Sequence, residues 1–206
     1  MKLQSKFIPL AATVSLFAAM SVFGSVSYTG FFSAQVFLNL LIDNAFLVIV
    51  AVGMTFVILS GGIDLSVGSV VALSTIVLAK LVQHLHWDLM VAIPLVLCMG
   101  TLFGAFMGWL IQRFRLQPFI VTLAGMFLAR GLCYLISIDS ISITDEAYTV
   151  LAQTRIHLWP EGPMVSISAV LALLVLAAAV FIAHCTQFGR TVYAIGGSEH
   201  SAVLMG

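Results

Sequence analysis

Long apolar segments, separated by short polar connections, make up most of this chain. We predict membrane-spanning helices at six of them, covering residues 7–26, 36–60, 67–83, 89–111, 118–138 and 163–184. Each segment holds close to the roughly 17–25 apolar residues that a tilted helix needs to cross a bilayer, although the third is marginal in length. The pattern therefore predicts an all-α membrane protein, whose backbone polar groups are bonded within helices.

The first apolar segment has two interpretations. Lys2 and Lys6 precede it as a basic region precedes the apolar core of a signal peptide. However, the apolar stretch is longer than a typical core of that kind, and residues 24–27 (Gly-Ser-Val-Ser) form only a mediocre cleavage site. We therefore favour a retained first span.

Composition supports a membrane protein and narrows its chemistry. The chain is 62% hydrophobic and 8% charged, and its mean hydropathy is +1.17, whereas a soluble domain exposes far more charge. No basic block indicates nucleic acid, and the three cysteines are isolated, as buried structural thiols are. His84 and His86 have no third metal ligand nearby, and the sequence holds no nucleophile elbow, phosphate loop or catalytic carboxylate pair. We predict neither an enzyme nor a chain that itself binds a metal or cofactor.

The placement of lysine and arginine predicts the orientation. A cytoplasmic N-terminus puts five basic residues inside and two outside, which agrees with the positive-inside rule. The inner set is Lys2, Lys6, Arg113, Arg115 and Arg190, and the outer set is Lys80 and Arg155. Residues 139–162 then form an extracytoplasmic loop, and residues 186–206 form a cytoplasmic one.

A polar, glycine-rich segment with the sequence SGGIDLSVGS separates the second and third predicted spans at residues 60–69. Gly61 and Gly62 suit a helix stop because glycine adopts positive φ without steric cost. Asp64 or Ser66 can cap the helix that follows. The segment is either a cytoplasmic turn or a helix break inside the membrane, which is tolerated only where it lines a cavity or is buried in protein.

Residues 188–206 form a second polar segment, directly after the last apolar one. Gly189, Gly196 and Gly197 allow tight turns at both ends of a short helical element. Ser198 can cap this element, and Glu199 in its first turn complements the helix dipole. The segment is either an ordinary loop or an element that a membrane protein offers to a soluble partner.

Three blocks of sequence resemble the sugar-importing permeases of ABC transporters, of the ribose, galactose and xylose type. The first block is VGMTFVILSGGIDLSVGS at residues 52–69, and the second is QPFIVTLAGM at 117–126 followed by Arg130-Gly131. The third is FGRTVYAIGG at 188–197, followed by Ala202 and Leu204. The sequence DNAFL at 43–47, joined to the second span, most resembles the galactofuranose permeases of this family.

The resemblance implies a function and a set of partners. It implies a transmembrane subunit of an importer in the bacterial inner membrane that carries a monosaccharide, with galactofuranose as a candidate. A cytoplasmic ABC ATPase would use the ATP, a second permease subunit would complete the path, and a periplasmic sugar-binding protein would deliver the sugar. Residues 139–162 are either the docking surface for that protein or an ordinary solvated loop. Full-length permeases of the family have roughly ten spans, so we expect residues 1–206 to be the N-terminal part of such a domain.

The resemblance, together with the polar residues near the spans, also implies two groups of site residues. The translocation path is assigned to Asp43, Asn44, Gly61, Gly62, Asp64, Ser66, Ser69, Thr122 and Arg130. Coupling to the ATPase is assigned to Gly189, Arg190, Tyr193, Gly196, Gly197, Glu199, Ala202 and Leu204. Arg190 serves equally well as a positive-inside anchor at the membrane edge.

Two of the path residues carry charges within predicted spans. If both spans are straight, Asp43 and Arg130 each lie about eight residues, or about 12 Å, from the outer end. An unpaired charge at that depth is costly, so we predict that the two face the protein interior and pair directly or through water. The pair is either structural or bonds to sugar hydroxyls. The alternative function, a secondary transporter or channel for a small polar solute, needs clustered intramembrane carboxylates, and only Asp43 and possibly Asp64 qualify.

Overall fold

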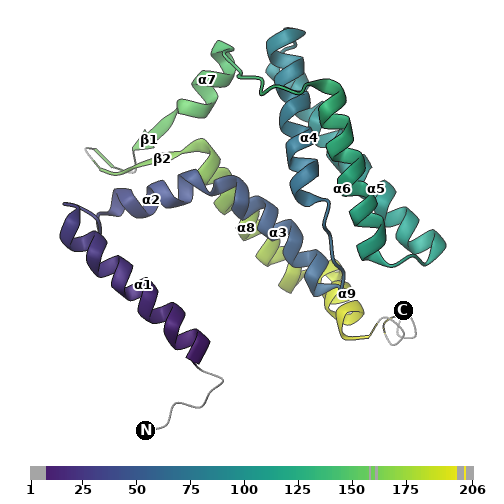
Figure 1. The fold of residues 1–206 in the computed structure, drawn as a ribbon, viewed down its shortest axis with the longest axis horizontal. Helices are drawn as coiled ribbons and strands as arrows, with labels where there is room; N and C mark the ends of the chain where they lie inside the picture. The colour runs from purple at the N-terminus through teal and green to yellow at the C-terminus, as the bar shows by residue number, and fades with distance from the viewer. Residues whose placement is uncertain (1–7, 158, 161, 199–201, 203–206) are drawn as a thin grey trace. The chain divides into compact units, whose positions relative to one another are not determined.

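The computed structural model describes residues 8–157, 159–160, 162–198 and 202. This part of the chain is helical apart from two short paired strands (Figure 1). The elements are α1 (Ile8–Ser27), α2 (Ala34–Asp43), α3 (Ala45–Leu59), α4 (Val67–Ala79), the π-helix η2 (Lys80–His84), α5 (Leu89–Phe114), α6 (Pro118–Ile136), α7 (Glu146–Gln153), β1 (Arg155–His157), β2 (Met164–Ser166), α8 (Ile167–Cys185) and α9 (Gln187–Gly197).

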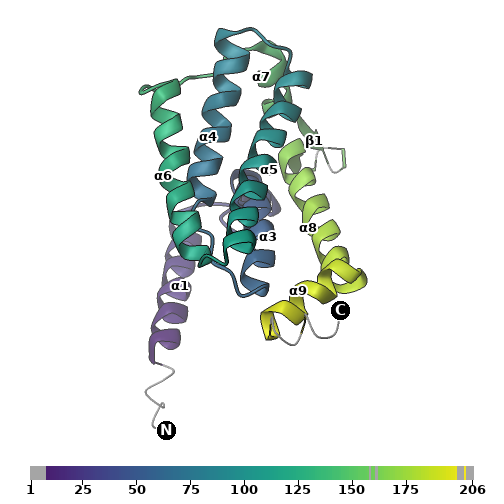
Figure 2. The ribbon, with the colours of Figure 1, turned by 90° about the vertical axis from the view of Figure 1, so that its right-hand side faces the viewer.

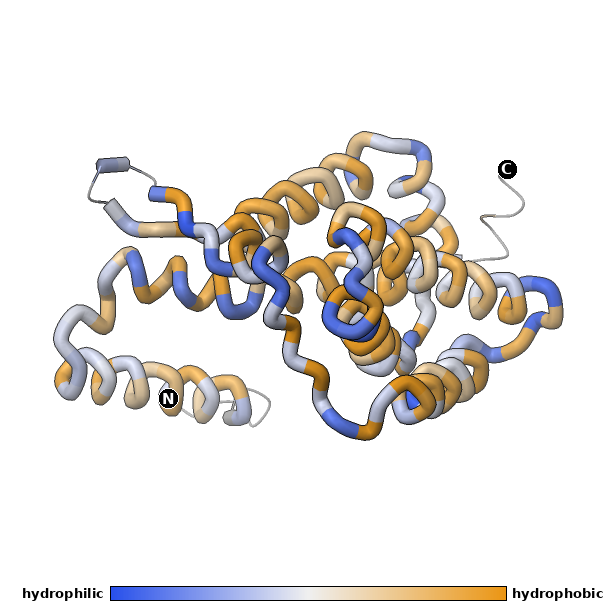
Figure 3. The backbone as a smooth tube through the Cα atoms, turned by 90° about the horizontal axis from the view of Figure 1, so that it is seen from above, coloured by the Kyte–Doolittle hydropathy of each residue, from blue (hydrophilic) through white to orange (hydrophobic). Residues whose placement is uncertain are grey.

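The predicted all-α membrane architecture is confirmed. Within the described residues, five helices are long and apolar enough to cross a membrane, or six if α2 and α3 together count as one broken span. Figure 3 shows the apolar residues running along the helices and the most polar residues gathered in the connections. Five of the six predicted segments coincide with α1, α4 continued by η2, α5, α6 and α8, to within a few residues at each end.

The span predicted at residues 36–60 is present as a broken pair of helices, α2 and α3, which are separated at Asn44. The Nδ2 amide of Asn44 donates to the carbonyl of Leu40 at 2.8 Å, and its backbone N–H bonds the same carbonyl at 3.2 Å. The side-chain amide thus competes for the carbonyl that the helical backbone bond uses, and α3 begins anew at Ala45. Asp43 is therefore the last residue of α2 and is exposed, so the depth of about 12 Å, which assumed a straight helix, does not apply to it.

The described chain divides into two compact units. Unit 1 holds α1, α2 and residues 155–165, and unit 2 holds α3 to α7, α8 and α9. In unit 1 the side-chain amide of Gln35 pairs with the backbone of Met164, accepting from its N–H at 2.8 Å and donating to its carbonyl at 3.2 Å. This pairing joins α2 to β2, two segments that are far apart in the sequence.

Unit 2 consists of two groups of packed helices (Figures 1 and 2). In one, α4 packs against both α5 and α6, and the sulfur of Met107 on α5 fills the space beside Gly125 on α6. In the other, α3 lies along α8, and α9 contacts both of them. The small buried residues Ala129 and Ala172 allow the helix backbones to approach closely within these groups.

The predicted outer loop 139–162 contains regular structure. It includes α7, whose first turn is capped by the Asp145 carboxylate accepting from the Tyr148 N–H at 3.0 Å. Just before α7, the Oε1 of Gln83 accepts the Thr144 N–H at 2.8 Å, and the Nε2 of Gln83 donates to the Thr144 hydroxyl at 3.0 Å. Ile143 packs on a buried apolar cluster that includes Leu81 and Val82. The start of this segment is therefore attached to the end of η2.

Candidate functional site

The glycine-rich segment begins with a helix stop of the predicted kind. Gly61 has φ +79° and follows the end of α3. Its N–H bonds the carbonyl of Ile58 at 3.0 Å, and the N–H of Gly62 bonds the carbonyl of Val57 at 2.9 Å. These two bonds form a Schellman motif with glycine at the left-handed position, where a side chain would strain the backbone.

Asp64 organises the other end of the segment. Its Oδ1 accepts the Ser66 N–H at 2.7 Å and the Ser66 hydroxyl at 2.6 Å. Ser66 is 1% exposed and makes no side-chain bond to the N-terminus of α4. The Ser66 hydroxyl is therefore a donor to Asp64 and not a helix cap, and the carboxylate shapes the turn into α4 by charge-assisted bonds.

Thr122 places the middle of the segment along α6. Its hydroxyl donates to the carbonyl of Pro118 at 2.8 Å and lies 3.3 Å from the carbonyl of Ile63. Thr122 lies four residues after Pro118, the first residue of α6, which is about one helical turn or about 6 Å along the axis. Ile63, which contacts Thr122, therefore lies beside α6 and about one turn from its start. Figure 1 shows the chain running beside α6 before α4 begins. This arrangement is closer to the helix-break interpretation than to a plain turn.

A cavity of about 610 Å³ opens beside this segment, and we call it the segment cavity. Asp64, Ser60 and Thr122 supply its polar groups, while Gly104 and Gly108 contribute the bare backbone of α5. Ile195 of α9 lines the same cavity. The fold therefore brings the three sequence blocks, which are far apart in the sequence, to one place.

The structure places the remaining predicted path residues elsewhere. Ser69 is buried in the first turn of α4, and its side chain is 3% exposed. Asp43 and Asn44 belong to unit 1, whereas Arg130 belongs to unit 2 and is exposed on α6. The pairing of Asp43 with Arg130 stays a prediction.

The predicted coupling element is the helix α9. The N-terminal cap of α9 is Thr186, whose hydroxyl accepts the Gly189 N–H at 3.3 Å. Ser198, which we expected to cap the element, follows the last residue of α9, and its role as the cap of a turn that includes Glu199 stays a prediction. Thr186 is the single residue between the end of α8 and the start of α9. Ala202 donates its N–H to the Ser198 carbonyl at 2.9 Å, and Glu199 and Leu204 lie outside the described residues.

The three glycines of α9 occupy different surroundings. Gly189 is buried, and a Cβ there would collide with the backbone carbonyls of Ile182 and Ala183 at the end of α8. A Cβ on Gly196 would collide with the carbonyl oxygen of Leu59, the last residue of α3. A Cβ on Gly197 would meet no atom of the described residues within 4 Å. Two of the glycines therefore allow close backbone contacts.

One face of α9 packs on α3 and α8, and residues of the other face are exposed among the described residues. Val192 is 7% exposed, and the ring of Phe188 lies 5.8 Å from the ring of Phe56 on α3. Arg190 and Tyr193 are exposed. The contacts made by Phe188 and Ile195 were not predicted, because the sequence does not reveal that α9 crosses the end of α3.

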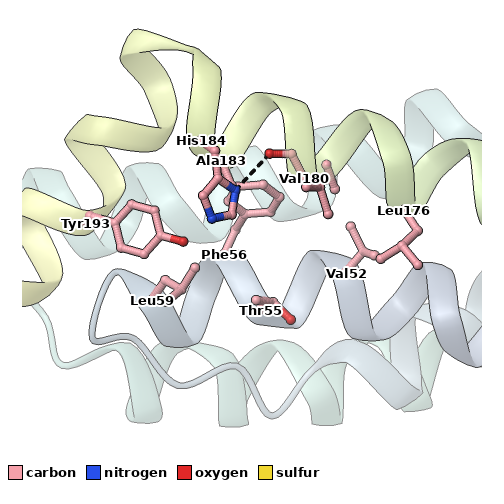
Figure 4. A pocket seen from close by; sticks show the side chains of 10 residues that line it. Val52, Thr55, Phe56, Leu59, Leu176, Val180, Ala183, His184 and Tyr193 are labelled. Carbon is pink, nitrogen blue, oxygen red and sulfur yellow. Dashed lines mark hydrogen bonds between the residues drawn. The ribbon is translucent and has the colours of Figure 1, made fainter.

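A smaller cavity of about 140 Å³ lies between α3, α8 and α9 (Figure 4). His184 and Tyr193 line it, with ring centroids 6.3 Å apart, and the Tyr193 hydroxyl points toward His184. The Nδ1 of His184 is bonded to the carbonyl of Val180 at 3.0 Å. The other lining residues are mostly apolar, which makes this a space between helices and not a second polar site.

Comparisons with known proteins identify the chain's relatives. Residues 36–206 match the family described as branched-chain amino acid transport system / permease component. The chain is 48% identical over 199 residues to the inner membrane ABC transporter permease protein YjfF of Escherichia coli K12, which covers 97% of this chain and 60% of that protein. It is 39% identical over 211 residues to the fructose import permease protein FruG of Bifidobacterium longum, and this match covers 100% of this chain and 62% of that protein.

A third relative is the ribose import permease protein RbsC of Escherichia coli K12, which is 33% identical over 194 residues, covering 94% of this chain and 59% of that protein. The chain thus spans about 60% of the length of these relatives. No solved structure matches the chain.

Proposed function

Because this chain belongs to the family of branched-chain amino acid transport system permease components, we propose that it is the transmembrane subunit of an ABC importer for a sugar. The membrane spans and the family match confirm the class of protein that the sequence blocks predicted. The relatives named for ribose and fructose import support a sugar as the transported solute. As a finer proposal, the sugar is galactofuranose, which rests on the resemblance of residues 43–47 to permeases of that kind.

One observation carries the proposal: α9 presents an exposed face while its other face packs on the end of α3 beside the segment cavity. An ATPase that binds the exposed face would act on the polar segment through one short helix. In this proposal the chain itself hydrolyses no ATP and needs no cofactor, and ATP hydrolysis belongs to that partner. The orientation with a cytoplasmic N-terminus, in the bacterial inner membrane, puts α9 on the side where ATP is available.

The segment cavity provides a place for a hydroxylated solute. Asp64 lines it, and Ser66 uses only Oδ1 of that carboxylate within the described residues. The Oδ2 atom is then available to accept a bond from a sugar hydroxyl, the strongest kind of hydrogen bond that a neutral sugar makes with a protein. A second permease subunit would close the path, and a periplasmic sugar-binding protein would dock on residues 139–162.

The test is whether the complete gene product co-purifies in detergent with the ATPase subunit encoded beside it. Gly197→Arg is the diagnostic variant, because a Cβ at this position meets no atom of the described residues within 4 Å and the side chain would project into the contact with the ATPase. We expect the variant to fold and to lose the ATPase.

Ser140→Arg, at an exposed position of the predicted outer loop 139–162, is the matched control and should keep the ATPase. A wild-type protein that never retains an ATPase would contradict the importer proposal and favour a secondary transporter. Loss of the ATPase from both variants would place the contact elsewhere than on α9.

A further inference from the structure

The contact between Gly196 and Leu59 joins two backbones directly. The position that a Cβ of Gly196 would take overlaps the carbonyl oxygen of Leu59 and lies 3.6 Å from the Cα of Ser60. In glycine a hydrogen occupies that direction, so the Cα–H of Gly196 points at the carbonyl, in the manner of a weak C–H···O contact. This carbonyl accepts no hydrogen bond from the described residues, as is common at the last turn of a helix.

Leu59 is the residue from which the polar segment starts. Ser60 follows it, then the Schellman glycine Gly61, and the chain continues to Asp64. Ile195, the neighbour of Gly196, lines the segment cavity together with Asp64. A displacement of the C-terminal end of α9 therefore reaches the start of the segment without an intervening side chain.

α9 is also held at its other end. Gly189 brings the backbone of α9 against the last turn of α8, and Phe188 contacts Phe56 on α3. Phe56 and Leu59 are three residues apart and so lie on the same face of α3. A helix fixed at both ends against α3 moves as a rigid body with little internal bending, whereas a helix attached by long side chains would not.

We infer that Gly196 is a positioning residue of the importer: its backbone contact with Leu59 transmits movement of α9 to residues 60–66 and thereby to Asp64. The inference rests on the proposed function, because it assumes that an ATPase moves α9. Gly61 and Gly62 supply the conformational freedom that residues 60–66 need to respond. Any residue larger than glycine at position 196 would push α9 away from Leu59 and so separate α9 from the start of residues 60–66.

Gly131, in the helix α6, makes a comparison possible, because it belongs neither to the proposed path nor to the proposed ATPase contact. Gly196→Ala and Gly131→Ala each add one methyl group to a helical glycine. The methyl group meets the Leu59 carbonyl in the first variant and no atom of the described residues within 4 Å in the second. A difference between the two variants therefore reports the contact at position 196 and not the added methyl group itself.

The experiment uses the complete gene product assembled with its ATPase. Cys98, Cys133 and Cys185 are replaced by serine, and an Ile63→Cys reporter carries an environment-sensitive fluorophore on a side chain that is 55% exposed. ATP with orthovanadate should change the fluorescence in the parent and in Gly131→Ala. In Gly196→Ala we expect the ATPase to co-purify as before, while the fluorescence change and the sugar transported per ATP hydrolysed each fall about tenfold.

Each outcome decides the inference. Equal responses in Gly196→Ala and the parent would overturn it, as would a reporter at position 63 that does not respond to ATP in the parent. If Gly196→Ala does not accumulate while Gly131→Ala does, position 196 serves the folding of the protein, and the inference is overturned. A parent that fails to bind any ATPase would instead overturn the proposed function, and the inference with it.

Discussion

At the scale of single residues, the polar segment is shaped by a few groups with defined partners. Asp64 accepts both the N–H and the hydroxyl of Ser66, and Ser66 is almost completely buried. Removing an acceptor from a buried donor leaves that donor unsatisfied, which costs more than the bond itself contributes. Asp64 is therefore needed for the local structure, whether or not its charge also contacts a sugar.

Two substitutions at Asp64 separate these roles. Asp64→Ala removes the acceptor and should lower the free energy of unfolding by about 1–3 kcal/mol, because Ser66 loses both bonds. Asp64→Asn keeps an oxygen in the same place and should keep most of the stability. If the charge also serves the path, Asp64→Asn loses transport while the protein stays folded.

Thermal unfolding in detergent and sugar uptake are the measurements. Asp139→Ala is the control, because Asp139 is exposed and its side chain makes no hydrogen bond within the described residues; it should change stability by no more than about 0.5 kcal/mol. Equal destabilisation by Asp64→Asn and Asp64→Ala would show that the side-chain oxygen is not the important acceptor.

At the scale of elements, the end of α4 shows how a local irregularity places a side chain. The last turn of this span is the π-helix η2, and Gln83 on η2 bonds Thr144 through both ends of its amide. A π-helical turn rotates the following side chains relative to a regular α-helix. The segment that includes Thr144 is thereby attached to the end of this span by the side-chain amide of Gln83, which forms the same kind of hydrogen bonds as a backbone peptide group.

Gln83→Ala should free this attachment. The loss of two hydrogen bonds should weaken local stability by about 1–2 kcal/mol, and residues 139–154 should become more sensitive to a protease added from outside. Gln153→Ala, at an exposed position with no hydrogen bond from its side chain within the described residues, should leave the cleavage rate unchanged. Equal cleavage of the two variants would show that Gln83 does not hold the segment.

At the scale of the whole molecule, orientation determines which partner each surface can meet. In unit 2, α9 lies at the end of α3 and α8, and the outer segment begins at the opposite end of α4 and α6 (Figures 1 and 2). The distribution of lysine and arginine predicts that α9 is cytoplasmic. The proposed roles of both surfaces depend on this orientation.

Cysteine labelling in intact cells tests the orientation. A protein that keeps only Cys185, which is exposed at the end of α8, should react with a membrane-impermeant maleimide only after the membrane is opened. A protein with Cys98, Cys133 and Cys185 replaced by serine and with Ser140→Cys added should react in intact cells. The reverse pattern would contradict the cytoplasmic N-terminus and place α9 outside.

The sequence alone determined the class of protein, the position of most spans and the presence of a break after Leu59. These features depend on local composition: the length of apolar runs sets the spans, and two adjacent glycines suit the Schellman motif. It also predicted a short helical element after the last span, although it missed Thr186 as the cap of α9, because several hydroxyl residues there can cap a helix equally well by local criteria.

Only the tertiary structure decided how these parts meet. The break at Asn44 falls at two polar residues, Asp43 and Asn44, inside an otherwise apolar run, and the run alone does not specify whether a helix continues through them. The contact of Gly196 with Leu59, and the gathering of Asp64, Thr122 and Ile195 around one cavity, join residues from different helices. Such contacts are set by the packing of helices far apart in the sequence, and the hydrophobic pattern of each helix constrains which face is apolar without specifying the partner that the face meets.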